Sequence, residues 1–201
     1  IVNVLGLITL LHQSVSHMTG NASLLAVHLL HGEYPEALFI TLVIFCFVLG
    51  SSYSGFILGN SHFKLGRRYG VPLSLVSLFL FFCWLFLKHY PHYSLLWAAA
   101  AMGIQNAMVS HYKGAIIRTT HLTGLLTDLG LNLGYLLRGL PVERRRVVLL
   151  IVILMGFLFG GIIVTWLYPY LNLHTFLIPV CLSLAMSLTY WTLYIRNQLH
   201  H

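Results

Sequence analysis

The chain consists of apolar runs that are interrupted twice by nearly the same polar phrase. Ser16-His17-Met18-Thr19-Gly20-Asn21 interrupts the first run, and Thr120-His121-Leu122-Thr123-Gly124-Leu125 interrupts a later one. Paired interruptions at matching places are typical of membrane proteins with an internal repeat, in which the broken segments hold a solute or an ion. The feature therefore predicts a duplicated membrane fold with a binding site at the breaks.

The composition independently indicates a protein embedded in a lipid bilayer. Only 7% of the 201 residues are charged, whereas soluble domains have about 25%. Runs such as residues 147–164 are continuously apolar and lack the alternation of a β-barrel strand. We therefore expect an all-α polytopic membrane protein, with residues 1–201 forming one membrane domain. The net charge of +7 does not indicate nucleic-acid binding, because the cations lie between apolar runs and not along one face.

Six spans are predicted, and a shorter helix follows each break, over about residues 21–30 and 125–138. The spans cover about residues 1–15, 36–59, 71–87, 94–120, 147–166 and 175–195, the fourth weakening after residue 105. Cations cluster after the second, fourth and sixth spans, at Lys64, Arg67, Arg68, Arg138, Arg144, Arg145, Arg146 and Arg196. The opposite side receives Glu33, Glu36, Lys88 and the aromatic turn Tyr168-Pro169-Tyr170. The positive-inside rule then places both termini in the cytoplasm.

Matched residues relate the two halves of the chain. At nearly constant separation, Asn3 pairs with Asn106, His17 with His121, Gly20 with Gly124, Gly32 with Gly139, and Pro35 with Pro141. Each half, residues 1–90 and 94–197, contains three spans, and an odd number makes the second copy enter the membrane from the opposite side. The sequence thus predicts two inverted three-helix repeats with interrupted first helices.

Small residues at four-residue spacing predict faces for close helix packing. They are Ser51, Gly55 and Gly59 in the second span and Gly156 and Gly160 in the fifth. Such faces pack against neighbouring helices or against a second copy of the chain. A homodimer or a larger membrane complex is therefore a candidate assembly.

Three motifs resemble the YoaK-like family, small bacterial inner-membrane proteins of unknown function. They are His17-Met18-Thr19-Gly20-Asn21, Gly103-Ile104-Gln105-Asn106-Ala107, and the run of residues 123–130. The resemblance covers nearly the whole chain and implies a six-helix protein of the bacterial inner (cytoplasmic) membrane. It implies no substrate. The family often has an acid in its first span, near where this chain has Asn3.

The paired breaks are the first candidate site. A helix that starts just after Gly20 or Gly124 presents unpaired N–H groups and the positive end of its dipole. Thr19, Asn21 and Thr123 can cap that end or contact a ligand, and His17 and His121 titrate near neutral pH. The breaks either hold a small polar or anionic solute together, or each merely caps a helix at the membrane interface.

Two further features carry candidate polar residues. Gln105, Asn106, Ser110, His111 and Lys113 form a polar face that must look into the bundle or a wet cavity, and Asn106 is favoured because Asn3 mirrors it. Lys113 and Arg118 alternatively reach the cytoplasmic interface. Asp128, placed in the first turn after the second break, is a candidate for proton or cation coupling, with helix capping as the alternative.

These observations predict a small-solute or anion transporter or permease, with an accessory subunit of a larger membrane complex as the alternative. No nucleophile–base pair or metal motif is present, so an enzyme is not expected. Haem would need facing histidines, for which His12, His17, His111 and His121 are available, but no attachment motif accompanies them. We therefore expect no metal and no cofactor. The expected partners are the lipid bilayer and a small polar solute or ion.

Overall fold

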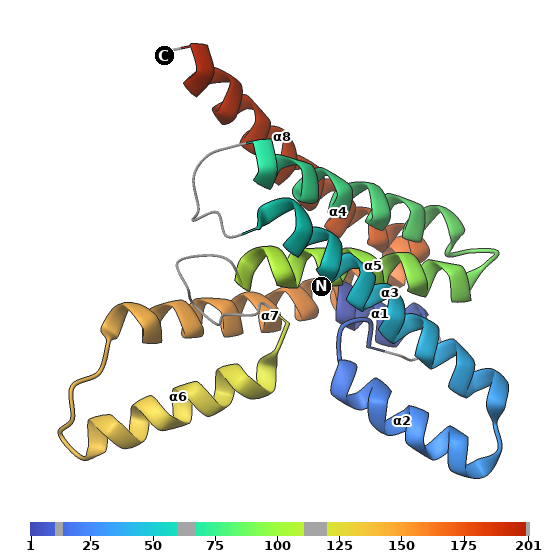
Figure 1. The fold of residues 1–201 in the computed structure, drawn as a ribbon, viewed down its shortest axis with the longest axis horizontal. Coiled ribbons are helices and arrows are strands. Elements are labelled where there is room, and N and C mark those ends of the chain that lie inside the picture. The colour runs from blue at the N-terminus through green and yellow to red at the C-terminus, as the bar shows by residue number, and fades with distance from the viewer. Residues whose placement is uncertain (11–13, 60–66, 111–119, 200–201) are drawn as a thin grey trace.

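The computed structural model describes residues 1–10, 14–59, 67–110 and 120–199, and no strand occurs within these ranges (Figure 1). The helices in chain order are α1 (Val2–Thr9), α2 (Met18–His31), α3 (Tyr34–Leu58), α4 (Arg67–Phe86), α5 (Pro91–Ser110), α6 (Leu122–Leu137), α7 (Arg144–Leu171) and α8 (Leu177–Leu199). A 3-10 helix, η2 (Asn172–Phe176), joins α7 to α8. The all-α prediction is confirmed.

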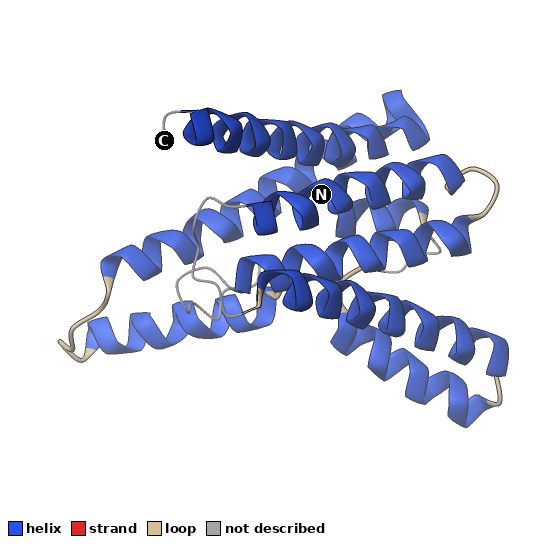
Figure 2. Ribbon diagram, turned by 45° about the horizontal axis from the view of Figure 1, so that its top comes forward, coloured by secondary structure: helices blue, strands red, loops and turns tan. Residues whose placement is uncertain are grey.

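Two helical hairpins extend toward opposite ends of the molecule. Helix α2 packs against α3, and α6 packs against α7 (Figures 1 and 2). The short helix of each hairpin ends at a glycine with a left-handed backbone, Gly32 at φ 76° and Gly139 at φ 70°. In each case the glycine N–H bonds the carbonyl three residues back, and the next N–H bonds the carbonyl five residues back. This double closure is the Schellman motif, which favours glycine because a Cβ is strained at positive φ.

Helix α5 lies against both α3 and α4, and its closest approach is to α3. A Cβ added at Gly50 would lie 2.2 Å from the carbonyl oxygen of Ala100, and one added at Gly103 would lie 2.1 Å from that of Phe47. The Ser51 hydroxyl donates to the Gly103 carbonyl at 3.1 Å. Small residues therefore allow the two backbones to meet.

The predicted small-residue faces are only partly right. Ser51 and Gly160 lie at helix contacts, Gly160 beside the side chain of Ile1. Gly55, Gly59 and Gly156 have nothing within 4 Å of an added Cβ. The four-residue spacing missed Gly50 and Gly103 because close packing depends on where the partner helix crosses, which spacing alone does not fix.

Several predicted boundaries are corrected by the structure. Helix α1 ends at Thr9, so the first span is shorter than residues 1–15. The aromatic turn at Tyr168-Pro169-Tyr170 is wrong, because these residues continue α7. Pro169 is accommodated near the carboxyl end of that helix, and the chain turns later, through η2.

Three helical segments of the described chain are long and apolar enough to cross a membrane. They are Tyr34–Leu58, Arg68–Phe86 and the 55-residue stretch Arg144–Gln198, which contains α7, η2 and α8. Large apolar side chains point outward from the helices, as in Leu30 at 87% exposure and Phe56 at 84%. Water would disfavour such a surface, whereas lipid chains suit it. The chain therefore has the helices of a membrane protein.

Candidate functional site

The two polar interruptions are built on the same internal hydrogen-bond pair. In the first half, the Asn3 amide nitrogen donates to the Ser16 hydroxyl at 2.8 Å, and that hydroxyl donates back to Asn3 Oδ1 at 3.0 Å. The Ser16 backbone N–H also donates to Asn3 Oδ1, at 2.9 Å. In the second half, the Asn106 amide nitrogen donates to the Thr120 hydroxyl at 2.7 Å, and that hydroxyl donates back to Asn106 Oδ1 at 3.0 Å. Each asparagine thus fixes the residue that precedes the histidine of its break.

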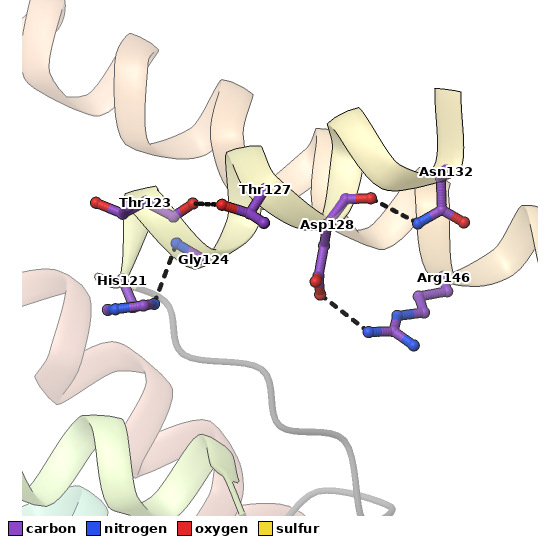
Figure 3. Close-up of polar contacts among 7 residues, drawn as sticks. All are labelled: His121, Thr123, Gly124, Thr127, Asp128, Asn132 and Arg146. Carbon is purple, nitrogen blue, oxygen red and sulfur yellow. Dashed lines mark hydrogen bonds and ion pairs between the residues drawn. The ribbon is translucent and has the colours of Figure 1, made fainter. Parts of the chain in front are cut away.

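Both histidines occupy the same position at the start of a helix. His17 is the N-cap of α2 with φ −86° and ψ 68°, and His121 is the N-cap of α6 with φ −92° and ψ 73°. His121 Nδ1 accepts a hydrogen bond from the Gly124 N–H at 3.2 Å (Figure 3). His17 makes no such side-chain bond. The N-caps are therefore histidines and not the predicted threonines or Asn21.

The glycines of the two breaks make room for the histidine rings. A Cβ added at Gly20 would lie 2.4 Å from His17 Cδ2, and one added at Gly124 would lie 2.4 Å from His121 Nδ1. The helices begin at Met18 and Leu122, so both glycines lie inside the first turn, and the expectation that the helices start after them is wrong. In both His-x-Thr-Gly phrases the imidazole thus lies over the third helical residue, and at His121 it also caps the helix.

Both breaks line a single cavity of about 810 Å³. Most of its lining residues form seven pairs that occupy matching places in the two halves. The pairs are Asn3 with Asn106, Leu7 with Ser110, Ser16 with Thr120, His17 with His121, Met18 with Leu122, Thr19 with Thr123, and Phe47 with Phe157. Of these, the two histidines, the threonines two residues after them, and Leu7 have exposed side chains. The structure thus brings five of the predicted site residues, and their matched neighbours, to one place.

Four predicted residues lie just outside this lining. Gly20 and Gly124 sit beneath the histidine rings, as described above. Asn21 is 3% exposed, and its amide nitrogen has no hydrogen-bond partner within the described ranges. Gln105 lines a neighbouring cavity of about 420 Å³, which shares Asn3, Thr120 and Phe157 with the larger one.

Asp128 lies away from the cavity. It is the seventh residue of α6, so its predicted place in the first turn is wrong. Its Oδ2 accepts from the Arg146 guanidinium at 2.9 Å, which ties α6 to the first turn of α7 (Figure 3). The carboxylate is about one-third exposed, so this is a surface ion pair that closes the hairpin. A coupling role for Asp128 stays a prediction.

Other predicted residues fall outside the described ranges. His12, His111, Lys113 and Arg118 belong to this group. Within the residues that the structure describes, no three side chains of the metal-ligating types gather into a possible metal site.

The comparisons with known proteins point to one family. A family model described as a protein of unknown function, DUF1275, matches residues 1–189. The chain belongs to the DUF1275 family. No curated protein and no solved structure matches this DUF1275 chain. The narrower YoaK-like label stays a prediction.

Sequence reasoning missed several residues of the DUF1275 cavity. Ser16 and Thr120 stand directly before the two histidines, so their place in the repeated phrase was the available signal. Phe47 and Phe157 each precede a glycine by three residues, in Phe47-Val48-Leu49-Gly50 and Phe157-Leu158-Phe159-Gly160. The correspondence of these two phenylalanines is hard to recognise in a sequence with so many apolar residues. It becomes evident because both of them line the cavity.

Proposed function

We propose that this protein is a permease for a small polar or anionic solute in the bacterial inner membrane, with its binding site in the 810 Å³ cavity. The observation that carries the proposal is that both interruptions contribute matched residues to one cavity. Its volume lies within the roughly 300–1,000 Å³ of small-molecule sites. Exposed threonines and histidines supply hydrogen bonds, and Phe47, Phe157 and Leu7 supply an apolar wall. The solute crosses unchanged, without a catalytic step.

The pattern of helix contacts supports an inverted repeat. If α1 to α4 correspond to α5 to α8, the contact of α3 with α5 corresponds to that of α7 with α1. The hairpin of α2 with α3 corresponds to that of α6 with α7, and the contact of α4 with α8 maps onto itself, whereas the contact of α4 with α5 has no counterpart of similar extent between α8 and α1. Shared Schellman closures at Gly32 and Gly139 add to the match. Such a relation is that of a pseudo-two-fold axis in the membrane plane.

The ends of the molecule support crossings by α3, α4, α5, α7 and α8, whereas the eight residues of α1 extend only about 12 Å and cover part of a sixth. The turn of the α2–α3 hairpin and the turn between α4 and α5 lie at one end, whereas the α6–α7 turn and the C-terminal end of α8 lie at the other (Figure 1). The second end carries Arg138, the arginines of residues 144–146, and Arg196. The first carries Glu33 and Glu36 beside Lys88. The positive-inside rule then makes the arginine-rich end cytoplasmic.

The short helices after the breaks complete the proposal. Helix α2 has 14 residues and α6 has 16, or about 21 and 24 Å at 1.5 Å per residue, which is less than the roughly 30 Å of the hydrocarbon core. Each therefore extends from the cavity toward a different face, α2 toward one and α6 toward the opposite one, without crossing (Figure 1). Rocking of one repeat against the other would expose the cavity to each side in turn.

A matched pair of substitutions on α6 tests the proposal. Thr123 lines the cavity, whereas Thr127, one turn further along the helix, does not. The full chain is reconstituted into liposomes, and the flux of a panel of small neutral and charged solutes is followed by light scattering. We expect Thr123→Trp to abolish a flux that Thr127→Trp preserves. If no solute crosses, or both variants behave alike, the permease proposal fails and an accessory subunit becomes the better account.

A further inference from the structure

We infer that the cavity binds a small monocarboxylate, with one carboxylate oxygen facing each half of the protein. This inference rests on the proposed function and names the solute class of that site. It is built on the sign of the charges around the cavity, on the hydrogen-bonding state of His121, and on the matched lining.

The carboxylate side chains of the chain all lie elsewhere. There are only four, and all of them belong to the described residues: Glu33, Glu36, Asp128 and Glu143. None lines the cavity. A cation held there would therefore lack a counter-charge and would lose much of its hydration energy without compensation. The site selects against cations.

The groups that face the cavity are donors of hydrogen bonds. Because His121 Nδ1 accepts from the Gly124 N–H, its proton resides on Nε2, which leaves that nitrogen as a donor. The hydroxyls of Thr19 and Thr123 can also donate. An acceptor-rich solute fits this arrangement.

The amount of negative charge follows from the helix ends. Helices α2 and α6 both begin at the cavity wall, and the amino end of a helix acts as roughly half a positive charge. Two such ends balance about one negative charge. The balance favours a monoanion.

The matched halves select the shape of the anion. Thr19 and Thr123, like His17 and His121, contribute the same groups from opposite repeats. A carboxylate has two equivalent oxygens related by its own two-fold axis, so each oxygen can accept from one half. The apolar walls at Phe47 and Phe157 leave room for an organic substituent.

An isosteric series of probes tests the charge and shape together. Benzoate, benzamide and benzamidine have nearly the same outline, and their charges are negative, neutral and positive. Thermal unfolding of the purified full chain is followed as each probe is titrated, because a ligand that binds the folded state raises Tm. We expect a saturable rise with benzoate, a smaller one with benzamide and none with benzamidine. A rise in Tm with benzamidine that equals or exceeds the rise with benzoate overturns the inference. The absence of a rise in Tm with benzoate also overturns it.

Substitutions in the two halves test whether they share the ligand. Thr19→Val and Thr123→Val should each raise the benzoate Kd by about tenfold, since each removes one hydrogen bond to a charged oxygen. Thr19→Ser and Thr123→Ser keep the hydroxyl and should bind as the wild type does. Thr127→Val, whose hydroxyl donates to the Thr123 carbonyl and lies off the cavity, is the control. An effect confined to one half contradicts the shared carboxylate.

The two proposals fail in different ways. If benzoate does not stabilise the protein but Thr123→Trp still blocks the flux of another solute, the carboxylate assignment is wrong and the permease stands. If Thr123→Trp and Thr127→Trp also behave alike in liposomes, both are wrong.

Discussion

The contact between α3 and α5 gives the sharpest prediction about stability, through the substitution Gly103→Ala. Its new Cβ would lie 2.1 Å from the Phe47 carbonyl oxygen and 3.1 Å from the Ser51 backbone nitrogen. Both obstacles are backbone atoms of a long helix, so no side chain can rotate out of the way. The helices must separate by about 1 Å to reach ordinary contact distance.

The magnitude follows from three terms. Overpacking at a tight interface costs about 1–3 kcal/mol, and a backbone obstacle places this site near the upper value. Separation also weakens the bond from the Ser51 hydroxyl to the Gly103 carbonyl, worth about 1 kcal/mol. Alanine gains about 1 kcal/mol over glycine in a helix interior. We therefore expect Gly103→Ala to lose about 3 kcal/mol of unfolding free energy.

Gly156→Ala provides the matched control, because a Cβ at that position of α7 meets nothing within 4 Å. It should stabilise the protein by up to about 1 kcal/mol through helix propensity alone. Unfolding in mixed detergent micelles, followed by circular dichroism, compares the two variants with the wild type. Equal stability of the two variants would refute the claim that α3 and α5 meet through their backbones at Gly103.

Four other substitutions separate the roles of residues at the breaks and in the α6–α7 hairpin. Asn3→Ala removes buried hydrogen bonds and Asn106→Ala removes partly buried ones, so each should lower the unfolding free energy by about 1–3 kcal/mol. A change below about 0.5 kcal/mol in either variant would contradict the claim that these asparagines hold the breaks in place. Asp128→Asn removes a surface ion pair with Arg146 and should change that free energy by less than about 1 kcal/mol; a larger loss would show that the pair does more than close a hairpin. Gly124→Ala should displace the His121 ring at little net cost in stability, because helix propensity offsets the lost cap, while it weakens benzoate stabilisation; unchanged benzoate binding would argue against His121 as a donor.

The helical membrane class could be predicted because it depends on composition and on the length of apolar runs, and both can be read directly from the sequence. The helices α3, α4 and α7 each begin within about four residues of the predicted spans. The boundaries of α1 and the continuation of α7 through Pro169 could not be predicted in this way. Hydropathy alone does not show where a helix ends when polar and apolar stretches are both short. A proline near a helix end is tolerated when neighbouring groups satisfy the hydrogen bonds of the backbone.

The candidate site was predicted as a set of residues but not as a geometry. The repeated phrase singled out His17, His121 and the glycines, yet it did not indicate that the imidazole itself caps the helix. Threonine is the commoner cap, so propensity favoured the wrong side chain. The partners Ser16 and Thr120 depend on a return of the chain onto Asn3 and Asn106, a contact over 13 and 14 residues that local patterns do not encode.

Within each break, some residues hold the backbone and others remain exposed, which explains how an interrupted helix can be stable in a membrane. Unwound backbone at membrane depth is tolerated only when its polar groups are satisfied. Asn3 with Ser16, and Asn106 with Thr120, satisfy one another, so they hold the break in place whether or not a solute is present. In the permease that we propose, the exposed threonines and histidines beside them are left to contact the solute. A site held in this way is preorganised, so we expect each break to move with its repeat as a rigid unit during transport and the change of shape to occur between the repeats.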